Sequence, residues 1–135
     1  MIAEFLDTNI LVYAFDSRAG SKHIIAAALL ERLLKEGSAA LSVQILIEFY
    51  AAATKGGMKS ERAGEIVFDL GICAFHRPDH ADVLQSIELL RRYKISWWDA
   101  LVINSANQLD CRVLWTEDLN HGQRYGGVTV RNPFL

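Results

Sequence analysis

Short apolar runs alternate along the chain with longer segments in which apolar residues recur every three or four positions. The short runs predict buried strands, and the longer segments predict helices with one buried face. We expect strands at residues 3–6, 39–41, 72–75, 112–115 and 128–130. We expect helices, counted with their cap residues, at residues 9–15, 21–36, 42–55, 60–70, 79–93 and 96–109.

Polar residues and glycines mark the expected ends of these helices. The residues expected to cap a helix N-terminus are Ser21, Ser42, Asp79 and Ser96. Gly37 and the pair Gly56-Gly57 are expected to end two of the helices, because glycine readily adopts the left-handed conformation that follows a helix.

The alternation of strands with helices indicates an α/β fold with three layers, α/β/α, around a mostly parallel five-stranded sheet. Two consecutive helices precede the third and the fourth expected strand, which fits helical insertions at one end of the sheet. The sequence has no internal repeat, low-complexity segment or linker, so residues 1–135 are expected to form one domain.

Composition narrows the class of protein. Hydrophobic residues make up 51% of the 135, enough for a packed core. The longest aliphatic run, residues 24–30, is too short for a membrane span, and no signal-peptide pattern is present. Cys73 and Cys111 are too few for a disulfide framework, so we expect a cytoplasmic protein. The net charge of -2 argues modestly against a nucleic-acid binder.

Four carboxylates stand among apolar residues and carry the candidate chemistry: Asp7, Glu48, Asp99 and Asp118. An ionised carboxylate that is buried alone is costly, so buried carboxylates are normally paired or bound to metal. None of the four has an evident lysine or arginine partner close by in sequence. If the fold gathers them, a divalent cation is the natural neutralising partner.

The expected elements place these carboxylates toward one end of the sheet. Asp7 and Asp118 each follow a strand, and ligands of open α/β sheets bind beyond the carboxyl ends of the strands. Glu48 lies in the second turn of its helix and Asp99 in the first turn of another. All four side chains are therefore expected to converge.

Three of the four also have a purely structural interpretation. Asp7 can cap the helix that follows it, and Asp99 stands three residues after Ser96, which is the spacing of a capping box. Asp118 and the adjacent Glu117 can be loop charges. Glu48 has the weakest structural explanation, because it stands in an apolar helix without a basic residue four positions on.

Aromatic and basic residues near Asp99 offer further candidates. Trp97 and Trp98 can stack on nucleic-acid bases, although burial in the core is the more ordinary role of tryptophan. Three basic residues precede the Asp99 helix and can contact phosphate, or can simply complement the dipole of a solvated helix end: Arg91, Arg92 and Lys94.

Taken in order, several segments resemble the PIN-domain ribonucleases, and in particular the VapC type of toxin from toxin–antitoxin pairs. These segments are Leu6-Asp7-Thr8-Asn9-Ile10-Leu11, Ser42-Val43-Gln44 with Glu48-Phe49, Trp98-Asp99-Ala100-Leu101 and Thr116-Glu117-Asp118-Leu119. The similarity runs the length of the chain, through Asn120-His121-Gly122-Gln123 to Asn132-Pro133-Phe134.

The resemblance implies an endoribonuclease that depends on Mg²⁺ or Mn²⁺, has a five-stranded parallel sheet and is frequently a homodimer. The acidic quartet of the family maps onto Asp7, Glu48, Asp99 and Asp118, and its site hydroxyl maps onto Thr116. Whether Glu117 or Asp118 points into the site stays open. A cognate antitoxin is implied, with a tail that blocks the site.

The mechanism suggested by this assignment is metal-assisted hydrolysis of RNA. Asp7 and Asp99 would hold the principal metal, and Asp118 and Glu48 would complete the site directly, through water or through a second ion. The metal would activate a water for in-line attack that leaves a 5′-phosphate and a 3′-hydroxyl. Thr116 would orient water or substrate.

Two other classes of protein compete with this hypothesis. A receiver-type phosphoacceptor domain also clusters aspartates at the end of a small α/β sheet. Such a domain requires a lysine after a late strand, and Val128-Thr129-Val130-Arg131 has none. The second class is a PIN-like module that binds RNA or protein without cutting, and the intact acidic quartet argues against it.

Overall fold

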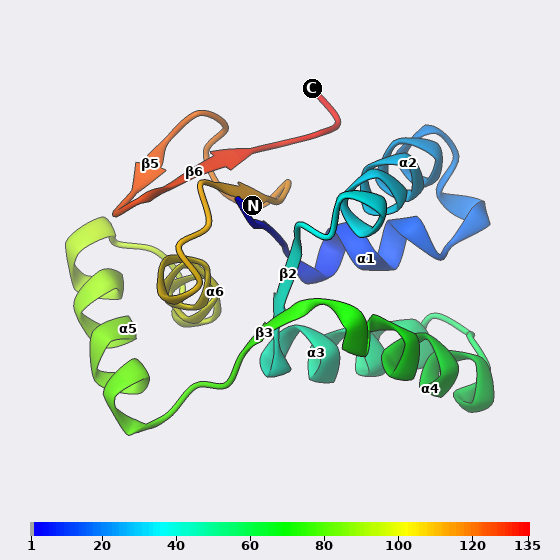
Figure 1. The fold of residues 1–135 in the computed structure, drawn as a ribbon, viewed down its shortest axis with the longest axis horizontal. Helices are drawn as coiled ribbons and strands as arrows, with labels where there is room; N and C mark the ends of the chain where they lie inside the picture. Colours follow the sequence, from blue (N-terminus) through cyan, green and yellow to red (C-terminus); the bar gives the residue numbers. More distant parts are fainter. Residues whose placement is uncertain (1) are drawn as a thin grey trace.

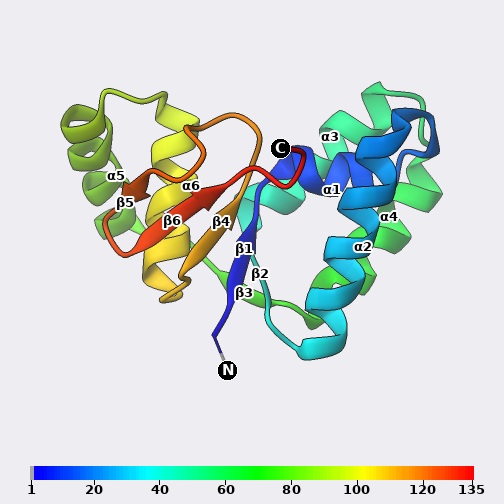
Figure 2. The same ribbon diagram turned by 90° about the horizontal axis from the view of Figure 1, so that it is seen from above.

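The chain folds into a mostly parallel sheet with helices on both faces, described for residues 2–135 by a computed structural model (Figures 1 and 2). The sheet order is β3-β2-β1-β4-β6-β5. The strands are β1 (Glu4–Leu6), β2 (Ala39–Ser42), β3 (Ala74–His76), β4 (Val113–Trp115), β5 (Arg124–Tyr125) and β6 (Val128–Arg131). The three-layer α/β/α prediction is confirmed.

Helices α1 to α4 lie on one side of the sheet, and α5 and α6 lie on the other (Figure 2). The helices are α1 (Thr8–Ala14), α2 (Ser21–Glu36), α3 (Val43–Lys55), α4 (Ser60–Asp69), α5 (His80–Tyr93) and α6 (Trp97–Gln108), with short 3-10 turns at Ser17–Ala19 and Leu70–Ile72. Within the described residues, no helix combines the length and the apolar character needed to cross a membrane.

The prediction of five strands is wrong by one. The additional strand, β5, has only two residues and pairs antiparallel with β6 through Tyr125 and Val128. A strand of two residues is too short to show the alternation by which strands are found in a sequence. It forms because Gly126, at φ 62°, turns the chain back between the two strands.

Most of the predicted helix ends are confirmed. Ser42, Asp79 and Ser96 each cap a helix through the side chain, and Gly37 ends α2 in the left-handed conformation. The prediction for Ser21 is wrong, because Ser21 is already the first residue of α2. Gly20 takes the cap position at φ 63° and ψ -128°, a conformation that favours glycine.

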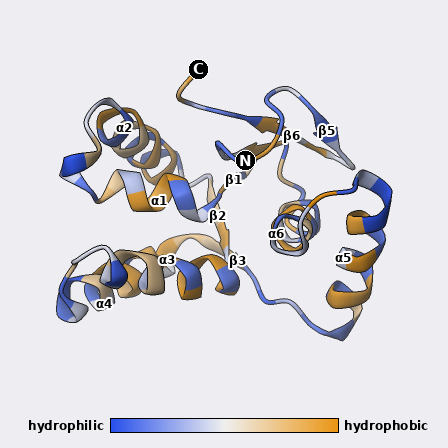
Figure 3. Ribbon diagram, turned by 180° about the vertical axis from the view of Figure 1, so that it is seen from behind, coloured by the Kyte–Doolittle hydropathy of each residue, from blue (hydrophilic) through white to orange (hydrophobic). Residues whose placement is uncertain are grey.

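Apolar side chains from both helical layers meet the sheet in the core. Phe5 and Leu114 of the central strands are fully buried, as are Leu33 of α2, Phe49 of α3 and Ile103 of α6. Figure 3 shows apolar residues along α2, α3 and the central strands, whereas the segment that leads into α5 is polar. Burial of this surface is the main force that holds the layers together.

Strand β1 lies at the point where the strand order reverses. The chain builds β1, β2 and β3 outward in one direction and then crosses over to place β4 on the other side of β1. The first residue after β1, Asp7, donates its backbone N–H to the Trp115 carbonyl oxygen at 3.0 Å. The ends of β1 and β4 are thereby held together at the topological switch point.

A buried polar network joins β3 to the helices on the α5–α6 side. The Asp82 carboxylate accepts from Asn104 Nδ2 at 2.9 Å and lies 3.2 Å from His76 Nε2, while His76 Nδ1 is 2.7 Å from Ser105 Oγ. Burial alone would raise the pKa of Asp82, but the hydrogen bonds from Asn104 and from the Asp79 backbone outweigh it and hold this pKa below its usual value.

We predict that Asn104→Ala destabilises the protein more at neutral pH than in acid. A carboxyl with a lowered folded-state pKa stabilises the fold above its unfolded pKa, about 3.9, and loses that contribution as the pH falls. Loss of the Asn104 donor should cost about 2 kcal/mol at about pH 7. Urea unfolding at about pH 7 and about pH 3 measures the difference, and an equal cost at both pH values contradicts the prediction.

Candidate functional site

The four predicted carboxylates lie around one small cleft at the switch point of the sheet. Its volume is about 140 Å³, room for several water molecules. Asp7, Glu48, Asp99 and Asp118 line it together with Thr8, Asn9, Trp98 and Val102. They come from α1, α3, α6 and the loop after β4, so the walls are built from both helical layers.

Asp7 is the most buried of the four, with 6% of its surface exposed. One carboxylate oxygen accepts the Thr8 backbone N–H at 2.8 Å, so Asp7 does cap α1. The other accepts the Thr116 hydroxyl at 2.8 Å. Burial raises the pKa of Asp7 from 3.8 to about 7, the two hydrogen bonds lower it in part, and the charges of Asp99 and Asp118 raise it further. The cap and site interpretations of Asp7 are therefore compatible.

Thr116 connects two of the carboxylates. Its hydroxyl donates to Asp7 Oδ2 and accepts from Asn9 Nδ2 at 3.2 Å and from the Asp118 backbone N–H at 3.1 Å. Thr116 is fully buried, and these three bonds use its hydrogen-bonding capacity. The expected role of orienting water or substrate does not fit this burial. Thr116 holds carboxylates in position instead.

Glu48 is held from two elements. Its Oε1 accepts from the Thr8 hydroxyl and from Gln44 Nε2, both at 3.2 Å. Partial burial raises the pKa of Glu48, although these two hydrogen bonds lower it in part. The other oxygen, Oε2, accepts no protein hydrogen bond within residues 2–135, which leaves it free to meet a ligand.

Asp99 forms only half of the expected capping box. Its backbone N–H donates to Ser96 Oγ at 3.1 Å, but within the described chain the reciprocal bond from the Ser96 amide to the Asp99 carboxylate is not formed. Asp79 and Asp82, at the start of α5, do complete such a box. The pKa of Asp99 is raised mainly by partial burial; the Ser96 hydroxyl lowers it and the charge of Asp118 raises it. The Asp99 carboxylate thus lines the cleft while staying in contact with the Ser96 hydroxyl at its own helix end.

The structure distinguishes Asp118 from Glu117. Glu117 accepts the Tyr13 hydroxyl at 2.6 Å and pairs with Lys22 Nζ at 2.8 Å, so its carboxylate is engaged away from the cleft. Asp118 lines the cleft, and its Oδ2 accepts from Asn9 Nδ2 at 3.0 Å. Of these two acidic residues, Asp118 is the one that lines the cleft.

The donor set of the cleft suits a hard divalent cation. Its carboxylates prefer ions such as Mg²⁺, and no lysine or arginine is among the described residues that line it. Buried beside it, Asn9 Oδ1 and Gln44 Oε1 have no hydrogen-bond partner among residues 2–135. Unpartnered buried oxygens of this kind are normally satisfied by water or an ion.

The carboxylates are nevertheless spread around the cleft. Within residues 2–135, no three acidic, histidine or cysteine side chains are grouped closely enough to hold one metal ion together. This arrangement therefore does not fit direct coordination of one ion by all four carboxylates. Mg²⁺ needs only one or two carboxylates, because it keeps several of its waters.

Two residues of the site were not singled out from the sequence. Thr8 and Gln44 both orient Glu48. Gln44 stands four positions before Glu48 on the same helix, so spacing alone is a signal for that contact. The Thr8 contact joins α1 to α3 across 40 positions, and only the fold brings those residues together.

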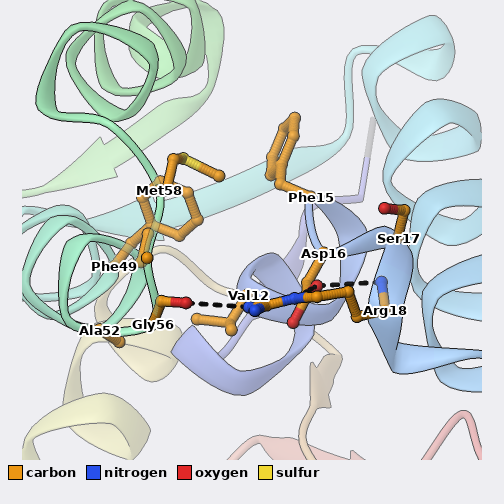
Figure 4. A pocket seen from close by; sticks show the side chains of 11 residues that line it. Val12, Phe15, Asp16, Ser17, Arg18, Phe49, Ala52, Gly56 and Met58 are labelled. Carbon is orange, nitrogen blue, oxygen red and sulfur yellow. Dashed lines mark hydrogen bonds and ion pairs between the residues drawn. The ribbon is translucent and has the colours of Figure 1, made fainter.

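A second cavity, of about 250 Å³, lies between the end of α1 and the end of α3 (Figure 4). Its walls are mainly apolar and include Phe15, Phe49 and Met58. The acidic residue there, Asp16, pairs with Arg18 at 3.0 Å, and Arg18 Nη2 also donates to the Gly56 carbonyl at 2.9 Å. This cavity thus lacks the cluster of carboxylates that lines the cleft.

Sequence comparison identifies a family for the chain. The family model described as PIN domain matches residues 5–126, which is most of the chain. No curated protein sequence matches significantly. The family assignment therefore rests on the domain as a whole rather than on one relative.

Several solved structures share the fold. A toxin–antitoxin complex from Klebsiella pneumoniae aligns with a TM-score of 0.73 at 21% identity, over 97% of this chain and 98% of the other. VapBC2 from Rickettsia felis, bound to a DNA fragment from its promoter, aligns with a TM-score of 0.69 at 24% identity over 98% of both chains. Mycobacterium tuberculosis VapC20, a toxin that cleaves the sarcin–ricin loop, aligns with a TM-score of 0.64 at 16% identity. The alignment covers 83% of this chain and 87% of that chain.

We predict that the burial of Asp7 makes the metal-free protein lose stability as the pH rises. A carboxyl whose pKa is raised by folding binds its proton more tightly in the folded chain. Stability is therefore greatest below the unfolded pKa and falls as the pH rises from about 4 to about 7. In EDTA, the free energy of unfolding of the wild type should fall by roughly 4 kcal/mol more than that of Asp7→Asn between these two pH values.

Urea unfolding of wild type and Asp7→Asn at several pH values measures the effect as the difference between two curves. The titrating groups that do not interact with Asp7 are common to both proteins and cancel in the difference. Parallel curves would contradict the prediction.

Proposed function

Because the chain belongs to the PIN-domain family, we propose that it is a metal-dependent endoribonuclease of the VapC toxin type. The observation that carries the proposal is the convergence of four carboxylates on one cleft without a basic residue in its lining. Clustered acids of this kind are costly without a cation and useful with one.

We assign Asp7 and Asp99 as the carboxylates that hold Mg²⁺ or Mn²⁺ directly, with Glu48 and Asp118 acting through bound water. This division fits the spread of the side chains, because no three of them are grouped for a single ion in the described chain. When bound, the cation lowers the pKa of a water ligand and neutralises charge that develops on the phosphoryl group.

The chain's own residues position the reacting groups. Thr116 and Asn9 fix the carboxylates on both sides of the switch point, and Thr8 and Gln44 fix Glu48. A water oxygen forms a bond to phosphorus in line with the bond from phosphorus to O3′, which breaks. Glu48, with a raised pKa and a free oxygen, accepts the proton of the water, and the leaving O3′ takes one from solvent. The products carry a 5′-phosphate and a 3′-hydroxyl.

The competing functions differ in how they fit the fold. Receiver domains have the strand order 2-1-3-4-5. The order here, β3-β2-β1-β4-β6-β5, is different and removes that alternative. A PIN-like module that binds without cutting has the same fold as a nuclease, and activity distinguishes the two. The homodimer suggested by the family stays a prediction.

We predict that the purified protein cuts total cellular RNA in the presence of Mn²⁺ and that EDTA stops the reaction. Asp7→Asn, Glu48→Gln, Asp99→Asn and Asp118→Asn should each lower the rate on the order of 100-fold or more, because each removes one carboxylate from the cleft. Gel analysis of the RNA fragments and their end groups measures rate and products.

The matched control is Asp69→Asn. Asp69 is exposed at the end of α4 and does not line the cleft, so this variant should cut at the wild-type rate. Cleavage that survives both EDTA and Asp7→Asn would overturn the metal-nuclease proposal. Folded protein that binds RNA without cutting it would establish the non-catalytic alternative.

We further propose a cognate antitoxin as the partner, as in the neighbours that are toxin–antitoxin complexes. The apolar cavity of Figure 4 and the acidic cleft both lie along the α1–α3 pair, since Val12 and Phe49 line the first while Thr8 and Glu48 line the second. A segment anchored in the apolar cavity therefore has a direct path to the cleft.

Ala52→Glu tests this partner, because Ala52 is exposed on α3 and lines the apolar cavity. It should weaken binding of the cognate antitoxin by tenfold or more, on the order expected for one buried unpaired charge. The control is Ala51→Glu, since Ala51 is equally exposed but does not line the cavity. Calorimetry measures both affinities, and equal affinities would contradict this site.

A further inference from the structure

Trp98 is an exposed aromatic side chain at the rim of the acidic cleft. Its exposed fraction is 61%, and it lines the cleft beside Asp99. Among the large hydrophobic side chains that are exposed in the described chain, it alone lines this cleft. Trp97, the preceding residue, is partly buried and does not line the cleft.

The apolar surface beside the carboxylates has a second member. Val102 stands one helical turn after Trp98 on α6 and also lines the cleft. The cleft is thus bounded by carboxylates from α1, α3 and the loop after β4 and by an apolar flank on α6. A flat ring at the edge of a site for phosphodiesters is suited to stack on a nucleobase.

Basic residues precede this ring by a few positions in the chain, at the end of α5. Helix α5 ends at Tyr93 and α6 begins at Trp97, so the last turn of α5 adjoins the first turn of α6. Arg91, Arg92 and Lys94 are exposed there, and none forms an ion pair with a carboxylate in residues 2–135. We call these three residues together with Trp98 the α5–α6 corner.

The positive charge of the α5–α6 corner contrasts with the net negative charge of the chain. The net charge is -2, and the cleft itself is acidic, so a polyanion needs local positive charge to approach. Sites for single-stranded nucleic acid pair basic residues along the backbone with aromatic rings under the bases. The α5–α6 corner has both parts, and its aromatic ring lines the cleft with the carboxylates.

Resting on the proposed nuclease function, we propose that RNA enters the cleft across the α5–α6 corner. Trp98 stacks on an unpaired base next to the scissile phosphate, and Arg91, Arg92 and Lys94 contact the flanking phosphates.

The test uses a synthetic RNA that spans a cleavage site mapped in total RNA. Trp98→Ala should raise KM about tenfold with a smaller change in kcat, and Trp98→Phe should recover most of the loss because its ring still stacks. An abasic nucleotide beside the cut should raise the KM of the wild type by about the same factor. It should leave the KM of Trp98→Ala unchanged. The control is Phe68→Ala, since Phe68 is 84% exposed on α4 and does not line the cleft.

Two binding measurements do not depend on cleavage. In the Asp7→Asn background, RNA should quench tryptophan fluorescence, and Trp98→Phe should remove most of the quenching. The pair Arg91→Gln and Arg92→Gln should reduce the salt dependence of binding by about 0.7 in log–log slope for each phosphate that the variant no longer neutralises. Lys55→Gln with Lys59→Gln, at the α3–α4 turn, is the matched control and should leave the slope unchanged.

The outcomes separate this inference from the function on which it rests. A wild-type KM in Trp98→Ala together with wild-type quenching in Trp98→Phe, with RNA still cut, overturns the inference and leaves the nuclease intact. RNA binding with the expected quenching but without any cleavage supports the inference and overturns the nuclease. If Trp98→Ala weakens only the antitoxin complex, the ring is a protein contact and the inference fails.

Discussion

The burial of Asp7 at the end of β1 is the constraint on which the rest of the site depends. A carboxylate with 6% exposure beside two other acids is unstable as an anion, and its pKa of about 7 expresses that cost. Two hydrogen bonds, donated by Thr8 and Thr116, stabilise the anion in part. Both donors sit at the junction of β1 with its neighbours, so the crossover that places β4 next to β1 also supplies the support for Asp7.

Much of the fold follows from signals that are local in the sequence. Ser42 and Ser96 act within three residues of their own position, and Gly37 is set by its own backbone conformation. The errors have a local origin as well, since the two-residue strand β5 shows no alternation and Gly20 displaces the adjacent Ser21 as a cap. Short elements and adjacent polar residues leave too little pattern for the sequence to decide.

The candidate site was less predictable, because its contacts join distant parts of the chain. The four acidic types were evident from their apolar surroundings, but the choice between Glu117 and Asp118 depends on Lys22, which is 95 positions away from Glu117. The hydrogen bond from Thr116 to Asp7 was not foreseen for a similar reason, since the two residues are 109 positions apart. Residue types suggested the chemistry, and only the tertiary contacts assign the direction in which each side chain points.

The bond between Glu117 and the α1–α2 side of the molecule also affects the entropy of ligand binding. Lys22 and Tyr13 hold Glu117, and the Thr116 hydroxyl holds the Asp118 amide, so the loop after β4 is fixed on both sides of Asp118. Ordering one backbone residue costs about 1–2 kcal/mol of conformational entropy. In this loop that cost is met during folding, so the free energy of a ligand's contacts with Asp118 is not reduced by the need to order the chain that carries it.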